Sequence, residues 1–143
     1  DQPGRLVHGR CFEERRRTGM GTYMTREDIE RRKARMVYDL LLGVPGVELR
    51  ERGGGRVAMT RGTGSISCQP LIYLDGVRTN RSTDPASMVQ SLLKAIPADH
   101  LEGVEIYKGR SQLPAEFGSA DARCGAVVLW TRHPGGGRGR GER

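Results

Sequence analysis

Short apolar segments separated by glycine and proline turns constrain the fold of this chain more than any other feature. The 143 residues include 21 glycines and 7 prolines, and glycine marks turns and tight backbone positions. No segment reaches the roughly 18 consecutive apolar residues that a membrane-spanning helix requires. Hydrophobic residues make up 36% of the chain, which is enough for a thin core in one domain of ordinary size.

The first half of the folded region predicts two helical segments and a hairpin. Thr25 is expected to cap a helix start, because its hydroxyl can accept a hydrogen bond from an unpaired amide and acidic residues follow it. Apolar residues at helical spacing between Met36 and Val44 predict a second helical stretch, ended by Pro45-Gly46. Alternation over residues 47–51 and 56–60, around a triple glycine, predicts a β-hairpin.

The second half predicts strands around one longer helix. Residues 70–74 form a short apolar strand that ends at the turn Asp75-Gly76. Asp84-Pro85 is expected to supply an N-cap and a first-turn proline, and Pro97 closes that helix. Residues 104–108 predict another strand, and residues 126–131 predict a continuous apolar strand at the centre of the sheet. The apolar face of the helix is expected to comprise Met88, Val89, Leu92, Leu93 and Ile96. The predicted fold class is therefore α+β, a small mixed β-sheet with flanking short helices.

The positive charge of the chain is concentrated at its two ends. The net charge is +7, of which residues 1–35 carry +4 and residues 132–143 carry +3, while residues 36–131 are neutral. We therefore predict a basic, irregular N-terminal arm at residues 1–19 with at most one short strand, a domain at 20–132, and a Gly/Arg-rich tail at 133–143. These ends could meet an acidic partner or keep the protein in solution. The basic side chains expected to interact there are Arg15, Arg16, Arg17, Arg138 and Arg140.

The sequence shows no pattern that predicts catalysis, and we expect neither a metal nor a cofactor. His8, His100 and His133 lie on three separate segments without ligand spacing. Asp75 and Glu105 are expected on neighbouring strands, where paired acid–base chemistry is conceivable. The favoured interpretation assigns Asp75 to a turn and Glu105 to the polar face of a strand. We therefore predict that the chain is not an enzyme.

Four segments carry motifs that are recognisable together. They are residues 39–47 (DLLLGVPGV), 70–77 (PLIYLDGV), 96–109 (IPADHLEGVEIYKG) and 124–132 (CGAVVLWTR). In this order they resemble the plug domain of the TonB-dependent outer-membrane receptors, over roughly residues 20–132. The resemblance implies a small mixed sheet with flanking helices that sits inside a transmembrane barrel, blocks its pore, and moves when an N-terminal box pairs with TonB.

Two features of the sequence depart from that family pattern. The sequence ends within a dozen residues of Arg132, where the barrel of the family begins, and residues 1–20 show no clear TonB box. We therefore expect a plug without its barrel.

These departures favour an exported, non-catalytic structural or interaction module with a plug-like fold. We expect this module to assemble with itself into an extracellular oligomer or filament. The start at Asp1 rather than Met fits a processed, exported protein or an excised segment. The first alternative is a plug that gates and binds ligand in a TonB-dependent transporter, in the periplasm or outer membrane, with a barrel or a TonB-like partner. The second is a basic nucleic-acid binder, which the neutral body of the chain does not favour.

The three cysteines carry two predictions. Cys68 and Cys124 directly precede the strands at 70–74 and 126–131, and if these strands are parallel neighbours the two cysteines lie within disulfide reach. Cys11 is then an unpaired thiol, available to another chain, and the arginines near it would raise its reactivity. The alternatives are that Cys11 packs with Phe12 into the body, that the arm adds a strand to a neighbouring subunit, or that all three cysteines are buried and reduced.

Overall fold

The structure, a computed structural model, describes residues 11–17, 19–50, 56–59, 69–81, 83–117 and 123–132. Residues 11–17 form a helix, which we call the 11–17 helix. Three short 3-10 turns follow later in the chain, η1 (Ala98–His100), η2 (Arg110–Gln112) and η3 (Ala115–Phe117). The remaining elements are β1 (Thr22–Met24), α2 (Arg26–Arg32), α3 (Val37–Leu41), β2 (Val47–Arg50), β3 (Arg56–Met59), β4 (Leu71–Leu74), β5 (Val77–Arg78), α4 (Ala86–Ala95), β6 (Leu101–Tyr107) and β7 (Ala126–Thr131).

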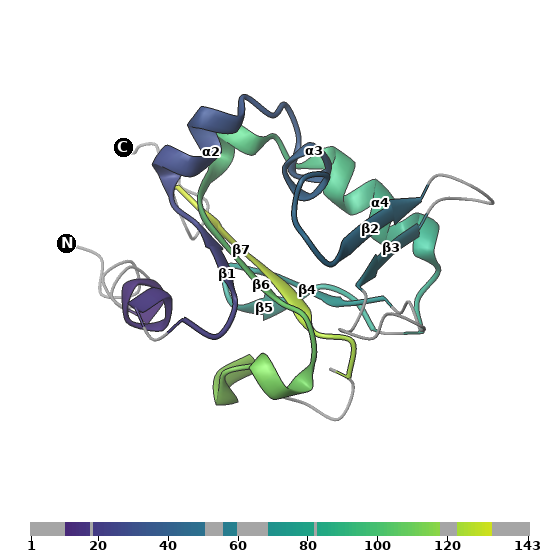
Figure 1. The fold of residues 1–143 in the computed structure, drawn as a ribbon. Coiled ribbons are helices and arrows are strands. Elements are labelled where there is room, and N and C mark those ends of the chain that lie inside the picture. Colours follow the sequence, from purple (N-terminus) through teal and green to yellow (C-terminus); the bar gives the residue numbers. More distant parts are fainter. Residues whose placement is uncertain are drawn as a thin grey trace, which may run out of the picture.

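A five-stranded mixed sheet organises the molecule, in the order β1-β6-β7-β4-β5. β4 and β7 run parallel, and the other neighbouring pairs run antiparallel. β2 and β3 form a separate antiparallel hairpin beside the sheet (Figure 1). The predicted fold class is confirmed, as are the hairpin and the central position of β7.

Side-chain alternation along the strands gives the sheet two buried faces. On β6, Val104 and Ile106 face one way, and Glu105 and Tyr107 face the other. α2, α3 and α4 cover the first face, where Ala98 of η1 also packs, whereas the 11–17 helix and η3 lie on the second (Figure 1). A sheet covered on both sides explains why β7 is apolar throughout.

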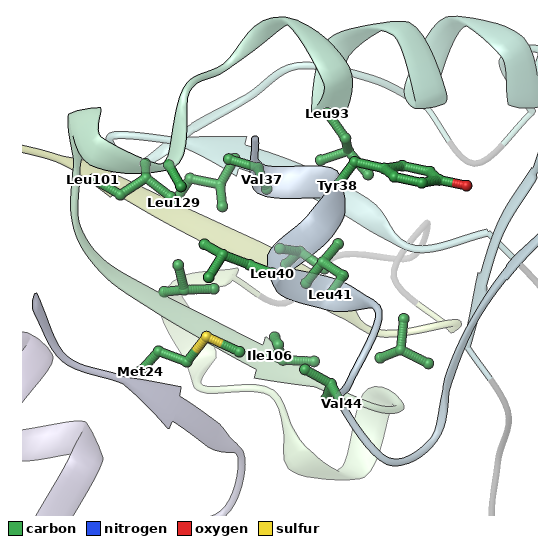
Figure 2. Close-up of a cluster of buried hydrophobic side chains, with 14 of the residues drawn as sticks. Met24, Val37, Tyr38, Leu40, Leu41, Val44, Leu93, Leu101, Ile106 and Leu129 are labelled. Carbon is green, nitrogen blue, oxygen red and sulfur yellow. The ribbon is translucent and has the colours of Figure 1, made fainter. Parts of the chain in front are cut away.

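The first core lies between the sheet and the helices. Leu40 and Leu41 of α3 are completely buried, and Figure 2 shows α3 lying between α4 and the strands that carry Ile106 and Leu129. Residues of this kind contribute about 1.5–3 kcal/mol each when fully buried. This core is therefore the main source of stability on that side of the sheet.

The helix boundaries confirm one predicted cap and correct another. Thr25 caps α2, because the amide of Asp28 donates to the Thr25 hydroxyl at 3.2 Å and the Asp28 carboxylate accepts from the Thr25 amide at 2.9 Å. The N-cap of α4 is Pro85 and not Asp84. The Asp84 carboxylate instead accepts from the amide of Arg81 at 2.8 Å, closing a turn before the helix.

Other expectations need correction. Met88 is 45% exposed and so lies off the buried face of α4. Residues 11–17 are helical and not an irregular arm. The short edge strands β1 and β5 were not predicted. Residues 1–10 and 133–143, and with them most of the predicted arm and tail, lie outside the described residues.

Candidate functional site

A completely buried carboxylate lies at the centre of the second face of the sheet. Glu105 is in the middle of β6, and its relative exposure is 0%. Tyr23 of β1 and Val128 of β7 are its cross-strand neighbours. An ionised carboxylate in such a position is costly unless it is paired and hydrogen-bonded, so its partners define the site.

Both oxygens of Glu105 are held by donors from distant parts of the chain. Arg15 of the 11–17 helix donates from Nε to Oε1 at 2.8 Å and from Nη2 to Oε2 at 2.6 Å. Trp130 of β7 donates its indole N–H to Oε2 at 2.6 Å. The Tyr107 hydroxyl donates to Oε1. The guanidinium therefore binds side-on with two parallel bonds, the geometry that makes arginine–carboxylate pairs strong.

Aromatic rings form the walls around the Arg15 guanidinium. Its Cζ lies 5.2 Å from the centroid of the Phe117 ring and 5.9 Å from that of the Trp130 ring. Both distances fall within the range for attraction between a cation and the face of an aromatic ring. Glu116 accepts a further hydrogen bond from Arg15 Nη1 at 2.6 Å. We call this set the Glu105 site: Glu105, Tyr107, Glu116, Phe117 and Trp130, with Arg15 as its occupant.

The charges and burial of the site shift two pKa values. Burial of Arg15 favours its neutral form, but the hydrogen bonds and negative charge of Glu105 outweigh this and raise the pKa of Arg15 above its ordinary value. Burial of Tyr107 raises its pKa, and the hydrogen bond to Glu105 raises it further. Arg15 therefore stays charged and Tyr107 stays protonated at neutral pH.

This arrangement is suited to holding a cation and not to transferring protons. The carboxylate already accepts four hydrogen bonds, which leaves its lone pairs engaged. Among the described residues, no group of three or more His, Cys, Asp or Glu side chains is placed to bind a metal ion. Within the same residues, no helix is long and apolar enough to cross a membrane.

Comparison with known proteins identifies the family. The family model described as TonB-dependent Receptor Plug Domain matches residues 14–122. The vitamin B12 transporter BtuB of Vibrio vulnificus (strain CMCP6) is 34% identical over 111 residues, which cover 77% of this chain and 17% of the transporter. This chain belongs to the TonB-dependent receptor plug domain family.

Solved structures show the same plug fold. A mutant of the ferric enterobactin receptor PfeA from Pseudomonas aeruginosa matches with a TM-score of 0.57 at 22% identity, over 85% of this chain and 18% of that one. The siderophore receptor PirA from Acinetobacter baumannii matches with a TM-score of 0.54 at 22% identity, over 78% of this chain and 17% of that one. The chain thus spans about a sixth of the length of these relatives.

Family membership settles several expectations. The resemblance to a receptor plug and the location in the periplasm or outer membrane are confirmed. Plug domains of this family are not enzymes. The comparisons support the transporter plug, given above as the first alternative, better than the self-assembling module that the sequence favoured.

The predicted basic residues of the plug occupy different environments. Arg15 is turned inward onto Glu105, with a side chain only 11% exposed, so it is already engaged within its own chain. Arg16 is exposed and pairs with Glu13 at 2.8 Å, and Arg17 is exposed. Arg138 and Arg140 lie outside the described residues.

The predicted cysteine arrangement is described only in part. Cys11 is a free thiol of intermediate exposure in the 11–17 helix. β4 and β7 are parallel neighbours, as the disulfide prediction required, and Leu71 lies opposite Ala126. Cys124 is buried directly before β7. Cys68 lies outside the described residues, so the Cys68–Cys124 bond stays a prediction, as does the availability of Cys11 to another chain.

The turn expected at Asp75 is confirmed, but the expected placement of Asp75 and Glu105 on neighbouring strands and of Glu105 on a polar face was wrong. β7 separates β4 from β6, so Asp75 and Glu105 do not lie on neighbouring strands. Asp75 accepts from the amide and hydroxyl of Thr131 at 2.9 and 2.8 Å and holds its turn against β7. Glu105 is buried and not on a polar face. The signal that could have revealed it is Trp130, a strand residue whose indole N–H needs an acceptor when buried.

Proposed function

We propose that this chain is the plug domain of a TonB-dependent outer-membrane transporter, where it occupies the lumen of a barrel and controls passage through it. The observation that carries the proposal is the family match over residues 14–122. The mixed sheet has a buried core on each face, which gives a compact body to occupy such a lumen. A barrel and a TonB-like protein are the corresponding partners, and the plug itself performs no catalysis.

The substrate class is proposed from the relatives. The most informative one is a vitamin B12 transporter, and several structural neighbours are siderophore receptors. A corrinoid is the first substrate to test, with a ferric siderophore as the second.

The test uses the full-length protein that contains this chain, purified from the outer membrane of its host. Its conductance in a planar bilayer is compared with that of a deletion variant lacking residues 20–132. A plug predicts low conductance for the intact protein and a large, steady conductance for the variant. Equal conductance of the two correctly inserted proteins would contradict the plug role.

A second measurement separates the plug from the self-assembling module. The tagged chain is followed through fractionation of the cell envelope and then through sedimentation. A plug is expected in the outer-membrane fraction together with a barrel, either on the same polypeptide or bound to it. Recovery of large particles of this chain alone, from the periplasm or medium, would reverse the choice between the two functions.

A further inference from the structure

We propose that the Glu105 site is a guanidinium-binding site, that Arg15 is its tethered and exchangeable ligand, and that an arginine side chain of a partner protein is the class of ligand that takes its place. Arg15 occupies the site in this structure through two hydrogen bonds to Glu105 and one to Glu116. The site binds a guanidinium group whether or not the chain gates a barrel.

The shape of the site selects guanidinium over ammonium. A side-on carboxylate matches the planar fork of N–H donors that only a guanidinium presents. The rings of Phe117 and Trp130 lie beside the same planar group, and guanidinium stacks on aromatic faces more readily than an ammonium does. A lysine side chain could satisfy the charge but not both carboxylate oxygens in this geometry.

The 11–17 helix meets the sheet through side chains one turn apart. Phe12 is buried, contacts the Tyr23 ring edge-to-face at 6.1 Å, and lies over Gly103, where a Cβ atom would come within 3.0 Å of its ring. Arg15 is the second attachment. Glu13, Glu14, Arg16 and Arg17 are exposed. Short isolated helices are marginal in water, so contacts with the body, Phe12 and Arg15 among them, help to hold these residues in place.

Departure of the helix would leave a site that still requires a cation. Glu105 would keep its bonds from Tyr107 and Trp130 but would lose the positive charge of Arg15 that balances it. Removing one partner of a buried ion pair is strongly unfavourable. The vacated site would also keep the negative charge of Glu116 and its aromatic walls, so a second guanidinium would be drawn into it.

Chemical complementation tests the site directly. The variant Arg15→Ala lacks the atoms that correspond to ethylguanidinium, which is therefore the probe. Trp130 is the only tryptophan in the chain, and its indole N–H donates to Glu105. The indole N–H resonance and the thermal midpoint are followed as ethylguanidinium chloride is added at millimolar concentrations, with ethylammonium chloride as the matched cation.

The expected result is a saturable shift of the Trp130 resonance and a rise in the thermal midpoint of Arg15→Ala with ethylguanidinium, and neither effect with ethylammonium. If Arg15→Ala does not fold alone, recovery of folded structure with ethylguanidinium only is the supporting result. Equal responses to both cations, or no saturable response to either, would overturn the proposal.

Two control variants isolate the site. Arg16→Ala removes a neighbouring exposed arginine that pairs with Glu13, and it should show no response because Arg15 still fills the site. Arg15→Ala combined with Glu105→Gln should also lose the response. A response in either control would place the binding elsewhere and contradict the assignment.

A final experiment tests whether the site prefers an arginine side chain of another protein over a lysine side chain. Phe12→Ala combined with Arg15→Ala releases the helix, and acetyl-arginine-amide is then compared with acetyl-lysine-amide. The arginine compound should shift the Trp130 resonance with at least tenfold tighter binding. Equal affinities would contradict a site for partner arginines.

Discussion

At the scale of the residue, Glu105 joins three segments that are far apart in sequence. It contacts Arg15, ninety positions earlier, and Trp130, twenty-five positions later. Each contact gives the buried carboxylate a donor from a distant part of the chain. The carboxylate therefore fixes how the 11–17 helix, β6 and β7 lie together.

Removing the Glu105 carboxylate should lower the stability of the folded protein. Glu105→Ala removes the carboxylate that accepts from the Trp130 indole and the Tyr107 hydroxyl, and with it the buried counter-charge of Arg15. We expect the free energy of unfolding to fall by about 3–5 kcal/mol, as for other broken buried pairs. Urea denaturation measures it. The control is Glu102→Ala, an exposed glutamate on the same strand, which should change stability by less than about 0.5 kcal/mol. Similar losses for the two variants would contradict this account.

Tyr107 should make the protein sensitive to alkali. Burial and the bond to Glu105 raise its pKa in the folded state, whereas in the unfolded state it ionises near pH 10. The unfolded state therefore loses this proton first, so the contribution is present below about pH 10 and is lost as pH rises further. The slope from one such group is at most about 1.4 kcal/mol per pH unit. Denaturation between pH 9 and 11.5 should show a shallower decline for Tyr107→Phe, and an unchanged decline would refute the assignment.

The sequence could not reveal the role of Glu105 because the role depends on distant contacts. Alternation along residues 104–108 correctly divides the strand into two faces, but it does not say that the second face is also covered. That cover comes from the 11–17 helix, whose main apolar anchor is Phe12. Within residues 11–17, Phe12 is the one large buried apolar side chain, which gives no clear periodic signal.

At the scale of the element, strands with strong local signals were predicted and those without were not. β4, β6 and β7 were predicted from apolar runs and turn residues, although β6 begins at Leu101 and not at 104. β1 and β5 contain three and two residues, too few for alternation to be seen. They are positioned by pairing with β6 and β4, which is tertiary information.

Two glycines, one after β4 and one before β7, allow the effect of backbone strain to be compared with that of steric crowding. Gly76 and Gly125 have φ angles of +89° and +83°. A Cβ atom at Gly76 would meet only the Trp130 ring at 3.8 Å, whereas at Gly125 it would lie 1.9 Å from the Tyr107 carbonyl oxygen. Gly76→Ala should therefore cost about 1–2 kcal/mol of strain, and Gly125→Ala more than about 4 kcal/mol. Denaturant titration of both variants provides the comparison, and equal costs would show that crowding at Gly125 is relieved.

At the scale of the whole molecule, one sheet separates two cores that are built differently. The core under α2, α3 and α4 is mostly aliphatic, with Tyr38 as its one aromatic ring among the buried residues (Figure 2). The opposite core is aromatic and surrounds an ion pair whose partner comes from the 11–17 helix. Loss of that helix should therefore perturb one side of the sheet and leave the other packed. The two sides of this body therefore differ in what holds them together.

The predicted Cys68–Cys124 disulfide would cross-link that body. The starts of β4 and β7 lie together, since the Leu71 amide donates to the Gly125 carbonyl at 3.1 Å. The bond would close a loop that contains β4, β5, α4 and β6, and reducing it should lower the free energy of unfolding by about 4 kcal/mol on loop-entropy grounds. Thiol titration of the unfolded, unreduced protein should find one free thiol, and peptide mapping should join Cys68 to Cys124. The control Cys11→Ser should leave the map and the effect of reductant unchanged. Three free thiols, or a bond that involves Cys11, would contradict the pairing.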